Sequence, residues 1–421
     1  PISQGFVDGE IVESEYDGIT AYLVEKDEYY YRDYLYSTPD GDYLDNAERF
    51  IFFSKSILEA IKVTGFVPDV LHCNDWETAL APVFLRTTHR DDPILKKIAT
   101  LFTIHNLGYQ GIFWQYDLHL LNIGWEYFTP DYLEFFGKIN FLKGGIVFSD
   151  IINTVSKKYS EEIQTEEFGF GLDGILRTRK DDLFGIINGI DYRDWDPSKD
   201  PYIPARYNTE NIKGKERCKK VLQETFGLSI DKNIPLIATI SRLADQKGFD
   251  LIVDSLEEML SFKTQYVVLG TGERKYHDIF KDLSKKFPHS FGIKIAYDNK
   301  LAHLIEAGAD MFLMPSKYEP CGLNQLYSLK YGTVPIVRGV GGLEDTIVDY
   351  NKEQEKGTGF KFYAYNVSEM LSAIKRALNL YRAKDAWLAL VKRCMKEDFS
   401  WRRSAAEYLE LYKKAIKKHE S

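Results

Sequence analysis

The chain has 421 residues, of which 44% are hydrophobic and 28% charged, and its formal net charge at pH 7 is −9. This length favours two large domains, and the composition is that of a soluble globular protein without an apolar run long enough to cross a bilayer. The negative net charge disfavours nucleic-acid binding, which depends on clustered Lys and Arg side chains.

The first half of the sequence alternates short apolar runs with amphipathic stretches, which is typical of an α/β domain. The expected helices cover 47–63 and 78–89, and the expected strands cover 67–73, 98–104 and 151–155. A domain join is expected near 183–191 (LFGIINGID), because a Pro- and Asp-rich stretch follows at 195–204.

From residue 235 onward the alternation becomes regular, and each β-branched run ends in a Gly, Ser, Pro or Asn turn. The expected strands are 235–240, 265–270, 293–297, 311–315 and 334–337. Nearly continuous apolar strands belong in parallel sheets that are covered on both faces. The sequence therefore predicts an α/β fold with two Rossmann-like, doubly wound domains, at 1–184 and 185–399, followed by an amphipathic helix at 400–421.

Polar residues follow the expected strands on their carboxyl side, where ligands bind in open α/β sheets. In a protein with two such sheets, we expect these polar residues to line one crevice between the sheets. They are His105, Asn106, Ser241, Arg242, Tyr297, Glu319 and the glycine turn at 339–342.

The segment SRLADQKG (241–248) places Arg242 and Lys247 at a strand-to-helix junction. Two fixed cations there would suit the two phosphates of a sugar nucleotide, although a pair of solvated surface charges is the simpler interpretation of the segment alone. The neighbouring motifs favour the phosphate clamp.

The turns GTGE (270–273) and GVGGLED (339–345) would let backbone N–H groups approach a ligand, although single turns of this kind are usually only tight loops. Neither turn is GxGxxG, and the chain has no GxxxxGK[ST] loop. A dinucleotide dehydrogenase and an ATP-hydrolysing motor are therefore disfavoured.

SKYEPCGLNQ (316–325) follows a buried strand and leads into a helix expected at 323–331. The N–H groups of Leu323 and Asn324 at the helix start are suitable donors to a diphosphate, and Glu319 would face a sugar hydroxyl. An ordinary capping loop is the alternative, and the combination of Glu, Pro, Cys and Gly makes it a poor one.

His72 and Asp75 also follow a strand, but they have no further partners at metal-ligand spacing, so a metal site is not expected. The four cysteines form no CxxC pair and are expected to be reduced thiols of a cytoplasmic protein. They are Cys73, Cys218, Cys321 and Cys394.

These motifs resemble the bacterial glycogen synthases and plant starch synthases of glycosyltransferase family 5, which have the GT-B fold with a central cleft. The resemblance covers nearly the whole chain. It includes HCNDWETALAP (72–82), FTIHNLGYQGIF (102–113), ISRLADQKGFDLI (240–252), VVLGTGE (267–273) and PSKYEPCGLNQLYSLKYGTVPIVR (315–338).

The resemblance implies a role for each matching residue. Arg242 and Lys247 would bind the donor phosphates, and Glu319 would contact the donor glucose and support the transition state. His105 and Asp75 would line the glucose pocket and complete the catalytic set. Further implied contacts are Asn106 and Asn188 to glucose or acceptor, Tyr297 to adenine, and Cys321, Gly322, Leu323 and Asn324 to the diphosphate.

The implied reaction moves glucose from ADP-glucose to the nonreducing 4-hydroxyl of an α-1,4-glucan, with retention and without a metal or organic cofactor. Domain 1–184 would be the acceptor side, 185–399 would bind the nucleotide sugar, and the helix at 400–421 would return to the first domain. The glucan would be glycogen, starch or a maltooligosaccharide, and the location cytoplasmic, or plastidic in a plant or alga. Alternatives are UDP-glucose as donor, a shorter acceptor, or a catalytically silent glucan-binding protein.

Two departures from the family pattern stand out. Many retaining GT-B enzymes carry a second glutamate eight residues after the first, where this chain has Tyr327. The family also begins with a strand and a KxGGL-type loop, and the first recognisable block here, at 29–50, resembles a region well inside its N-terminal domain. We therefore expect the chain to be a truncated form.

Overall fold

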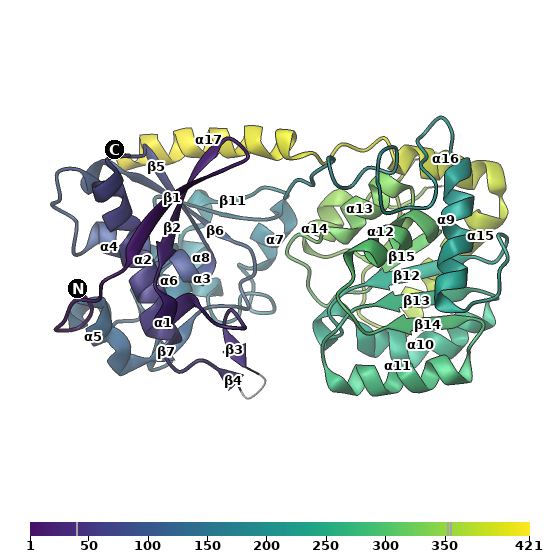
Figure 1. The fold of residues 1–421 in the computed structure, drawn as a ribbon, viewed down its shortest axis with the longest axis horizontal. Coiled ribbons are helices and arrows are strands. Elements are labelled where there is room, and N and C mark those ends of the chain that lie inside the picture. The colour runs from purple at the N-terminus through teal and green to yellow at the C-terminus, as the bar shows by residue number, and fades with distance from the viewer. Residues whose placement is uncertain (39–40, 352, 354–355) are drawn as a thin grey trace. The chain divides into compact units, whose positions relative to one another are not determined.

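The structure is a computed structural model that describes residues 1–38, 41–351, 353 and 356–421 (Figure 1). Two positions of the block at 29–50, Pro39 and Asp40, thus lie outside the described residues. The chain divides into two compact units. The first unit comprises residues 1–155, 160–185 and 407–421, and the second comprises 156–159 and 186–406. Among the described residues, no helix is both long and apolar enough to cross a membrane.

The first unit is built on a parallel sheet of four strands in the order β11-β10-β6-β5. Its strands are β5 Val70–Asn74, β6 Ala99–Ile104, β10 Ile151–Thr154 and β11 Leu183–Gly185. Every residue of β6 is buried, as expected for a strand whose two sheet faces are both covered. The three strands predicted in this half are confirmed, each within about three residues.

Helices and small antiparallel sheets surround this four-stranded sheet. The helices are α1 Asp27–Tyr30, α2 Asn46–Thr64, α3 Asp75–Thr78, α4 Leu80–Arg86, α5 Leu118–Leu121, α6 Phe141–Phe148, α7 Lys157–Glu162 and α8 Asp173–Thr178. The small sheets pair β1 Glu10–Tyr16 with β2 Ile19–Glu25, β3 Ser37–Thr38 with β4 Gly41–Asp42, and β9 Lys138–Asn140 with both β7 Ile112–Trp114 and β8 Glu134–Phe135. The single helix predicted at 78–89 is instead two short helices, α3 and α4.

The second unit is built on a parallel sheet of six strands in the order β14-β13-β12-β15-β16-β17. The strands are β12 Leu236–Ile240, β13 Gln265–Leu269, β14 Phe291–Lys294, β15 Met311–Met314, β16 Val334–Arg338 and β17 Phe360–Phe362. All five strands predicted in this half are present. The third begins and ends earlier than predicted, so Tyr297 lies in the loop after β14 and not at the end of that strand.

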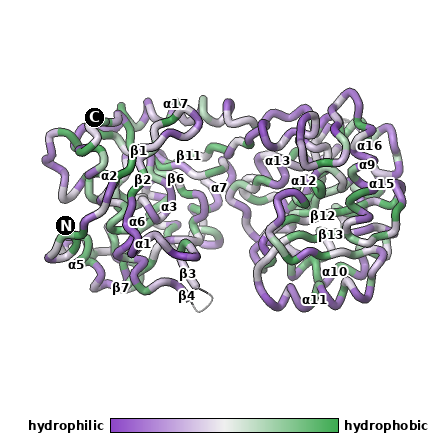
Figure 2. The backbone as a smooth tube through the Cα atoms, viewed as in Figure 1, coloured by the Kyte–Doolittle hydropathy of each residue, from purple (hydrophilic) through white to green (hydrophobic). Residues whose placement is uncertain are grey.

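Helices cover the second sheet. They are α9 Lys213–Phe226, α10 Phe249–Ser261, α11 Arg274–Lys286, α12 Asn299–Gly308, α13 Asn324–Tyr331, α14 Gly341–Thr346, α15 Val367–Arg382 and α16 Lys384–Cys394. Figure 2 shows the difference between layers, because the strands are largely hydrophobic whereas α11 is mostly hydrophilic. Only Tyr276 and Phe280 of α11 are buried, so this helix covers the sheet with one narrow face.

The strand order places a switch point in the second unit between β12 and β15. From β12 the chain proceeds outward through β13 and β14, and then returns to the other side of β12 to form β15, β16 and β17. In open α/β sheets, the loops at the carboxyl ends of the strands separate at such a point and leave a crevice for ligands. The loops after β12 and β15 carry SRLADQKG and SKYEPCGLNQ, the two motifs singled out by sequence.

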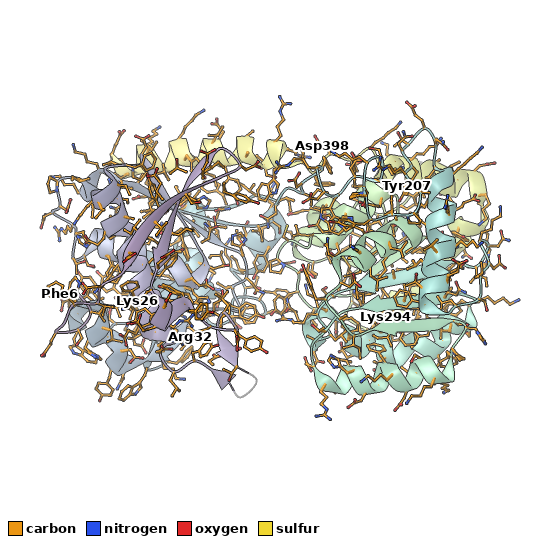
Figure 3. The ribbon with its side chains drawn as sticks, in the orientation of Figure 1. Phe6, Lys26, Arg32, Tyr207, Lys294 and Asp398 are labelled. Carbon is orange, nitrogen blue, oxygen red and sulfur yellow. The ribbon has the colours of Figure 1, made fainter. Side chains whose placement is uncertain are left out.

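The segment that enters the second unit, residues 186–212, is attached to that unit by buried polar contacts. Tyr207, labelled in Figure 3, is buried and donates its hydroxyl hydrogen bond to the Tyr331 carbonyl at 2.8 Å. The last helix, α17 Trp401–His419, belongs to the second unit up to residue 406 and to the first unit from residue 407. Within the first unit, its Tyr412 hydroxyl lies 3.0 Å from Nδ1 of His72.

Candidate active site

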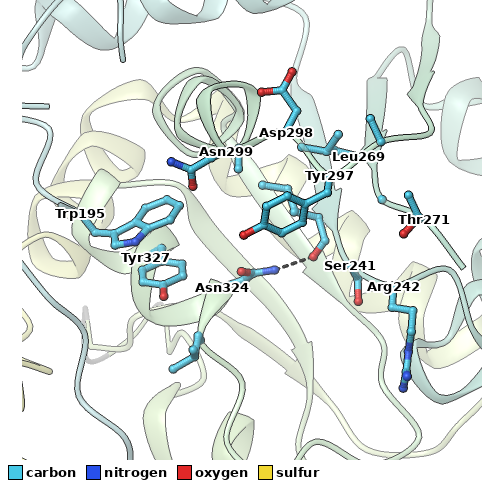
Figure 4. A pocket seen from close by; sticks show the side chains of 15 residues that line it. Trp195, Ser241, Arg242, Leu269, Thr271, Tyr297, Asp298, Asn299, Asn324 and Tyr327 are labelled. Carbon is cyan, nitrogen blue, oxygen red and sulfur yellow. Dashed lines mark hydrogen bonds between the residues drawn. The ribbon is translucent and has the colours of Figure 1, made fainter. Parts of the chain in front are cut away.

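A pocket of about 480 Å³ opens at the carboxyl end of the second sheet (Figure 4). The loops after β12, β13 and β14 line it, together with the first turns of α12 and α13. Its lining includes four residues predicted from the sequence, Arg242, Tyr297, Leu323 and Asn324. The size suits a small organic ligand, and the position coincides with the switch point of the sheet.

The aromatic and polar residues of the pocket differ in exposure: Tyr297 is 92% exposed, whereas Asn324 is half-buried. The Asn324 side-chain amide donates a hydrogen bond to the carbonyl of Ile240, the last residue of β12. This bond joins the start of α13 to the end of β12. The exposed ring of Tyr297 remains available for stacking on a flat ligand.

Sequence reasoning missed an aromatic stack at the back of this pocket. The Trp195 indole lies between the rings of His303 and Tyr327, with both centroid distances 3.9 Å and interplanar angles of 11° and 13°. His303 is held in turn by Asp200, whose carboxylate lies 2.8 Å from Nδ1. Trp195 begins the Pro- and Asp-rich stretch at 195–204 that follows the expected domain join, and the one available signal was the presence of a tryptophan there.

Glu319 and Lys247 form a close ion pair beside the switch point. The Lys247 ammonium donates to both Glu319 carboxylate oxygens, at 2.8 and 2.6 Å, and Ser316 donates its hydroxyl to the same carboxylate at 3.0 Å. Glu319 is only 5% exposed. A buried carboxylate needs this compensation, because burying an unpaired charge is costly.

The glycine turn at 339–342 supports the Glu319 loop. Gly341 has φ +45°, and a Cβ there would lie 2.0 Å from the Glu319 carbonyl oxygen. The Gly342 N–H donates to that carbonyl at 3.0 Å. The sequence interpretation of these N–H groups as ligand donors is therefore wrong for Gly342, whose N–H bonds the protein backbone.

The remaining predicted residues of the second unit lie around the same loops. Arg242 is exposed, and its guanidinium donates to the Gln246 side chain at 3.0 Å. Gly322 adopts φ +67° two residues before the start of α13, where a left-handed turn favours glycine. Cys321 is buried, and burial raises the pKa of its thiol to about 12 although the Asn188 backbone N–H partly opposes this shift.

The predicted residues of the first unit form a second group at the ends of β5 and β6. Asp75 adopts φ +54° and its carboxylate accepts a hydrogen bond from the His105 backbone N–H at 2.7 Å. Burial raises the pKa of Asp75 to about 6, although backbone N–H groups of His105 and Asn106 act in the opposite direction. The His105 ring contacts Asn74 Oδ1 at 2.9 Å, and burial lowers its pKa.

The His72 ring is held by protein groups at both of its nitrogens. Both ring nitrogens of His72 are occupied, by Tyr412 and by the Thr103 hydroxyl at 2.6 Å, and burial lowers its pKa to about 4. No cluster of three or more His, Cys, Asp or Glu side chains with metal-binding geometry occurs in the described part of the chain. His72 therefore joins the sheet to α17.

Comparisons with known proteins give the class. The family model described as "Starch synthase catalytic domain" matches residues 3–178, and the one described as "Glycosyl transferases group 1" matches residues 223–388. The sucrose-phosphate synthase of Thermosynechococcus elongatus aligns with a TM-score of 0.61 at 15% identity, over 96% of this chain and 85% of that one, and shows a common fold. The protein is thus a glycosyltransferase with the GT-B fold, as predicted.

Relatives with higher sequence identity show which family of glycosyltransferases the chain belongs to. The glycogen synthase of Koribacter versatilis is 49% identical over 97% of this chain and 83% of its own length, and that of Thermotoga maritima is 47% identical over 95% and 82%. The catalytic domain of starch synthase IV from Arabidopsis thaliana, solved with ADP and acarbose, aligns with a TM-score of 0.89 at 31% identity, over 97% of this chain and 85% of that one. The chain belongs to the glycogen synthase and starch synthase family of glucosyltransferases.

Proposed function

We propose that this protein transfers glucose from ADP-glucose to the nonreducing 4-hydroxyl of an α-1,4-glucan, with retention at the anomeric carbon. The observation that carries the proposal is the ion pair between Lys247 and the buried Glu319 carboxylate, together with a pocket that presents Tyr297 and the start of α13. The related starch synthase IV was solved with ADP and acarbose, which supports an adenine nucleotide and a glucan-like acceptor here.

The pocket suggests how the donor would bind. Tyr297 offers an exposed ring for adenine, and Arg242 with the N–H groups of Leu323 and Asn324 would face the diphosphate. Bringing a diphosphate near Lys247 would let its ammonium share its charge between Glu319 and the leaving group. Preorganised charges of this kind stabilise a departing diphosphate more than they stabilise the bound donor.

Glu319 would act on the transferred glucose. Its carboxylate is held by Lys247 and Ser316, so its position is set before the donor arrives. A fixed negative charge there would stabilise the positive charge that develops on the sugar ring as the bond to the diphosphate breaks. The glucose or acceptor would contact three residues of the first unit, which are Asp75, His105 and Asn106. Asn188 of the second unit would make a further contact with the glucose or acceptor.

We propose that the reaction needs no metal or organic cofactor, because Arg242 and Lys247 would supply the positive charge that a diphosphate requires. Unchanged initial rates after treatment with a chelator would support this.

A cytoplasmic location is proposed on the state of the cysteines, all four of which are buried free thiols, as is usual in reducing compartments.

The deciding experiment compares initial rates with ADP-glucose and UDP-glucose on glycogen and on a short maltooligosaccharide. Faster transfer from ADP-glucose to glycogen supports the proposal. Faster transfer from UDP-glucose would make UDP-glucose the donor in the proposal. Transfer to the short maltooligosaccharide alone would make that oligosaccharide the acceptor. Glucan binding without transfer from either donor would show a silent binding protein, and Glu319→Ala would then leave that binding unchanged.

A further inference from the structure

A second pocket, of about 510 Å³, lies in the second unit beside the segments through which the chain enters and leaves that unit. Residues 190–193 and 400–402 line it, together with Lys199. Among the described residues, this pocket and the candidate active site have no lining residue in common. A ligand bound here would therefore leave the pocket at the switch point open, and the volume suits a small organic molecule.

Backbone contacts hold the two walls of this second pocket against each other. The Ile190 N–H donates a hydrogen bond to the Phe399 carbonyl at 2.8 Å, and the Phe399 N–H donates to the Tyr192 hydroxyl at 2.8 Å. The walls are in close contact, because a Cβ at Gly189 would lie only 2.4 Å from the Cα of Trp401. The side chains that line the pocket are therefore carried by a defined backbone.

The charges that line the second pocket are mostly positive, although the whole chain is negative. Arg193 neutralises the carboxylate of Asp191 through a 2.9 Å hydrogen bond from Nε to Oδ2, and this bond lowers the pKa of Asp191. Lys199 and Arg402 are exposed, and in the described part of the chain neither side chain forms a hydrogen bond or an ion pair. The pocket therefore presents two cations to an anionic ligand.

Arg402 also lies where a helix disfavours a cation. The first turn of α17 has no acidic residue and contains Trp401, Arg402 and Arg403, although the helix dipole is positive at this end. Asp398, labelled in Figure 3, accepts a hydrogen bond from the Ser400 N–H at 2.9 Å, and the Arg403 guanidinium donates to the Asp398 carbonyl at 3.5 Å. Arg402 has no such contact among the described residues, so an anion in the pocket would offset its unfavourable position.

An exposed aromatic ring narrows the class of ligand. Trp401 is 47% exposed and lines the pocket beside Arg402. A guanidinium and an ammonium suit a phosphate group, and a flat indole suits the apolar face of a sugar ring. A bare phosphate would not use the indole, and a neutral sugar would not use the cations. A phosphorylated monosaccharide uses both.

We infer that the pocket formed by residues 190–193, Lys199 and residues 400–402 is a second ligand site, which binds a small phosphorylated sugar. Lys199 and Arg402 bind the phosphate, and Trp401 stacks on the sugar ring. Because the ligand contacts both walls, its binding fastens the segment at 190–193 to the start of α17. The inference does not depend on which nucleotide sugar is the donor.

The test measures binding by calorimetry in the presence of saturating ADP, which keeps the candidate active site occupied. The probes are glucose 1-phosphate, glucose and inorganic phosphate. The wild type should bind glucose 1-phosphate about tenfold or more tightly than glucose, because of the charged hydrogen bonds to phosphate. It should also bind glucose 1-phosphate about threefold or more tightly than inorganic phosphate, because of stacking on Trp401.

Variants separate the two parts of the ligand. Arg402→Gln and Lys199→Gln should each weaken binding of glucose 1-phosphate and of inorganic phosphate about tenfold, whereas Trp401→Leu should weaken only glucose 1-phosphate. Arg403→Gln is the matched control, because it removes the same charge from the same turn of α17 but does not line the pocket. It should leave both affinities within about twofold of the wild type, since exposed charges at a distance are screened.

Three results would overturn the inference. The first is that glucose 1-phosphate does not bind the ADP-saturated wild type, which does not depend on whether any variant folds. The second is equal affinity of the wild type for glucose 1-phosphate and inorganic phosphate, which would remove the sugar from the assignment. The third is an equal loss of affinity in Arg403→Gln and Arg402→Gln. The proposed function is judged separately, by glucose transfer measured without glucose 1-phosphate.

Discussion

A carboxyl group behind the pocket gives the sharpest stability prediction. Glu306 on α12 is fully buried, its Oε2 accepts a 2.7 Å hydrogen bond from the Ser328 hydroxyl, and its Oε1 has no partner among the described residues. Burial, opposed by the Ser328 bond and by nearby Lys215, raises its pKa from 4.5 to about 8. Near neutral pH, Glu306 is therefore largely protonated in the folded protein and ionised in the unfolded chain.

The sign and size of the effect follow from linkage. Below pH 4.5 both states hold the proton, so the shift has no effect on stability there. Between pH 4.5 and 8 the unfolded state loses its proton first, and the free energy of unfolding falls by about 1.4 kcal/mol per pH unit. The loss reaches roughly 3 kcal/mol at pH 7 and a little over 4 kcal/mol at pH 8, and it levels off near 5 kcal/mol above about pH 9, where both states are ionised.

Glu306→Gln removes this titration with little change of shape. We expect the difference in unfolding free energy between the variant and the wild type to grow in favour of the variant by about 3.5 kcal/mol from pH 5 to pH 8. The Glu306→Gln variant should lose some stability at every pH, because one end of the new amide takes the place of the Glu306 oxygen that has no partner. That loss does not vary with pH.

The assay is urea unfolding at several pH values, with hydrogen exchange of peptides from α12 to follow the second unit alone, since a two-unit protein need not unfold in one step. Glu216→Gln on α9 is the control, because the Glu216 side chain is 68% exposed and should leave the pH slope nearly unchanged. Parallel pH curves for Glu306→Gln and the wild type would refute the reasoning.

Three further predictions concern the candidate site. Tyr297→Ala should weaken ADP binding about fivefold or more with no change in melting temperature, because its exposed ring contributes to ligand stacking and hardly to the core; calorimetry and thermal melting check the two parts. If ionised Asp75 is needed to hold the His105 backbone, kcat/KM should fall as pH drops through about 6, and Asp75→Asn should be slower but lack that limb of the pH profile. Gly341→Ala should lower stability by about 2 kcal/mol or more and displace Glu319, since the new Cβ meets its carbonyl at 2.0 Å; urea unfolding together with initial rates measures both effects.

The strands of both sheets were predictable because buried parallel strands are continuous apolar runs bounded by turn residues, as at 311–315. The candidate residues after β12 and β15 were predictable for a related reason, since polar groups at strand ends meet at the carboxyl edge of a sheet. Element ends were less certain. The helix expected at 78–89 starts earlier, with α3 at Asp75, and α4 ends at Arg86 because Thr87 leaves the helical conformation with φ −120° and ψ −91°.

Contacts between residues far apart in sequence could not be predicted from local pattern. The stack of Trp195 on Tyr327 joins residues 132 positions apart, and neither periodicity nor turn chemistry carries a signal for such a pair. The pairing of Lys247 with Glu319 was also not predicted, because both residues were assigned separately to phosphate and sugar. Burial of the Glu319 carboxylate is what demands the partner, and burial of a loop residue is a tertiary property.

Helix α13 shows how these non-local contacts produce a defined site. A helix of eight residues is not stable in isolation, so its geometry must come from its neighbours. Asn324 bonds the end of β12, Tyr327 stacks on Trp195, and Ser328 bonds the buried Glu306. The three residues are spaced by three and four positions, so these contacts lie along one side of the helix and hold it against its neighbours. The residues of α13 that face the pocket are therefore positioned by the surrounding protein, and binding does not have to order them.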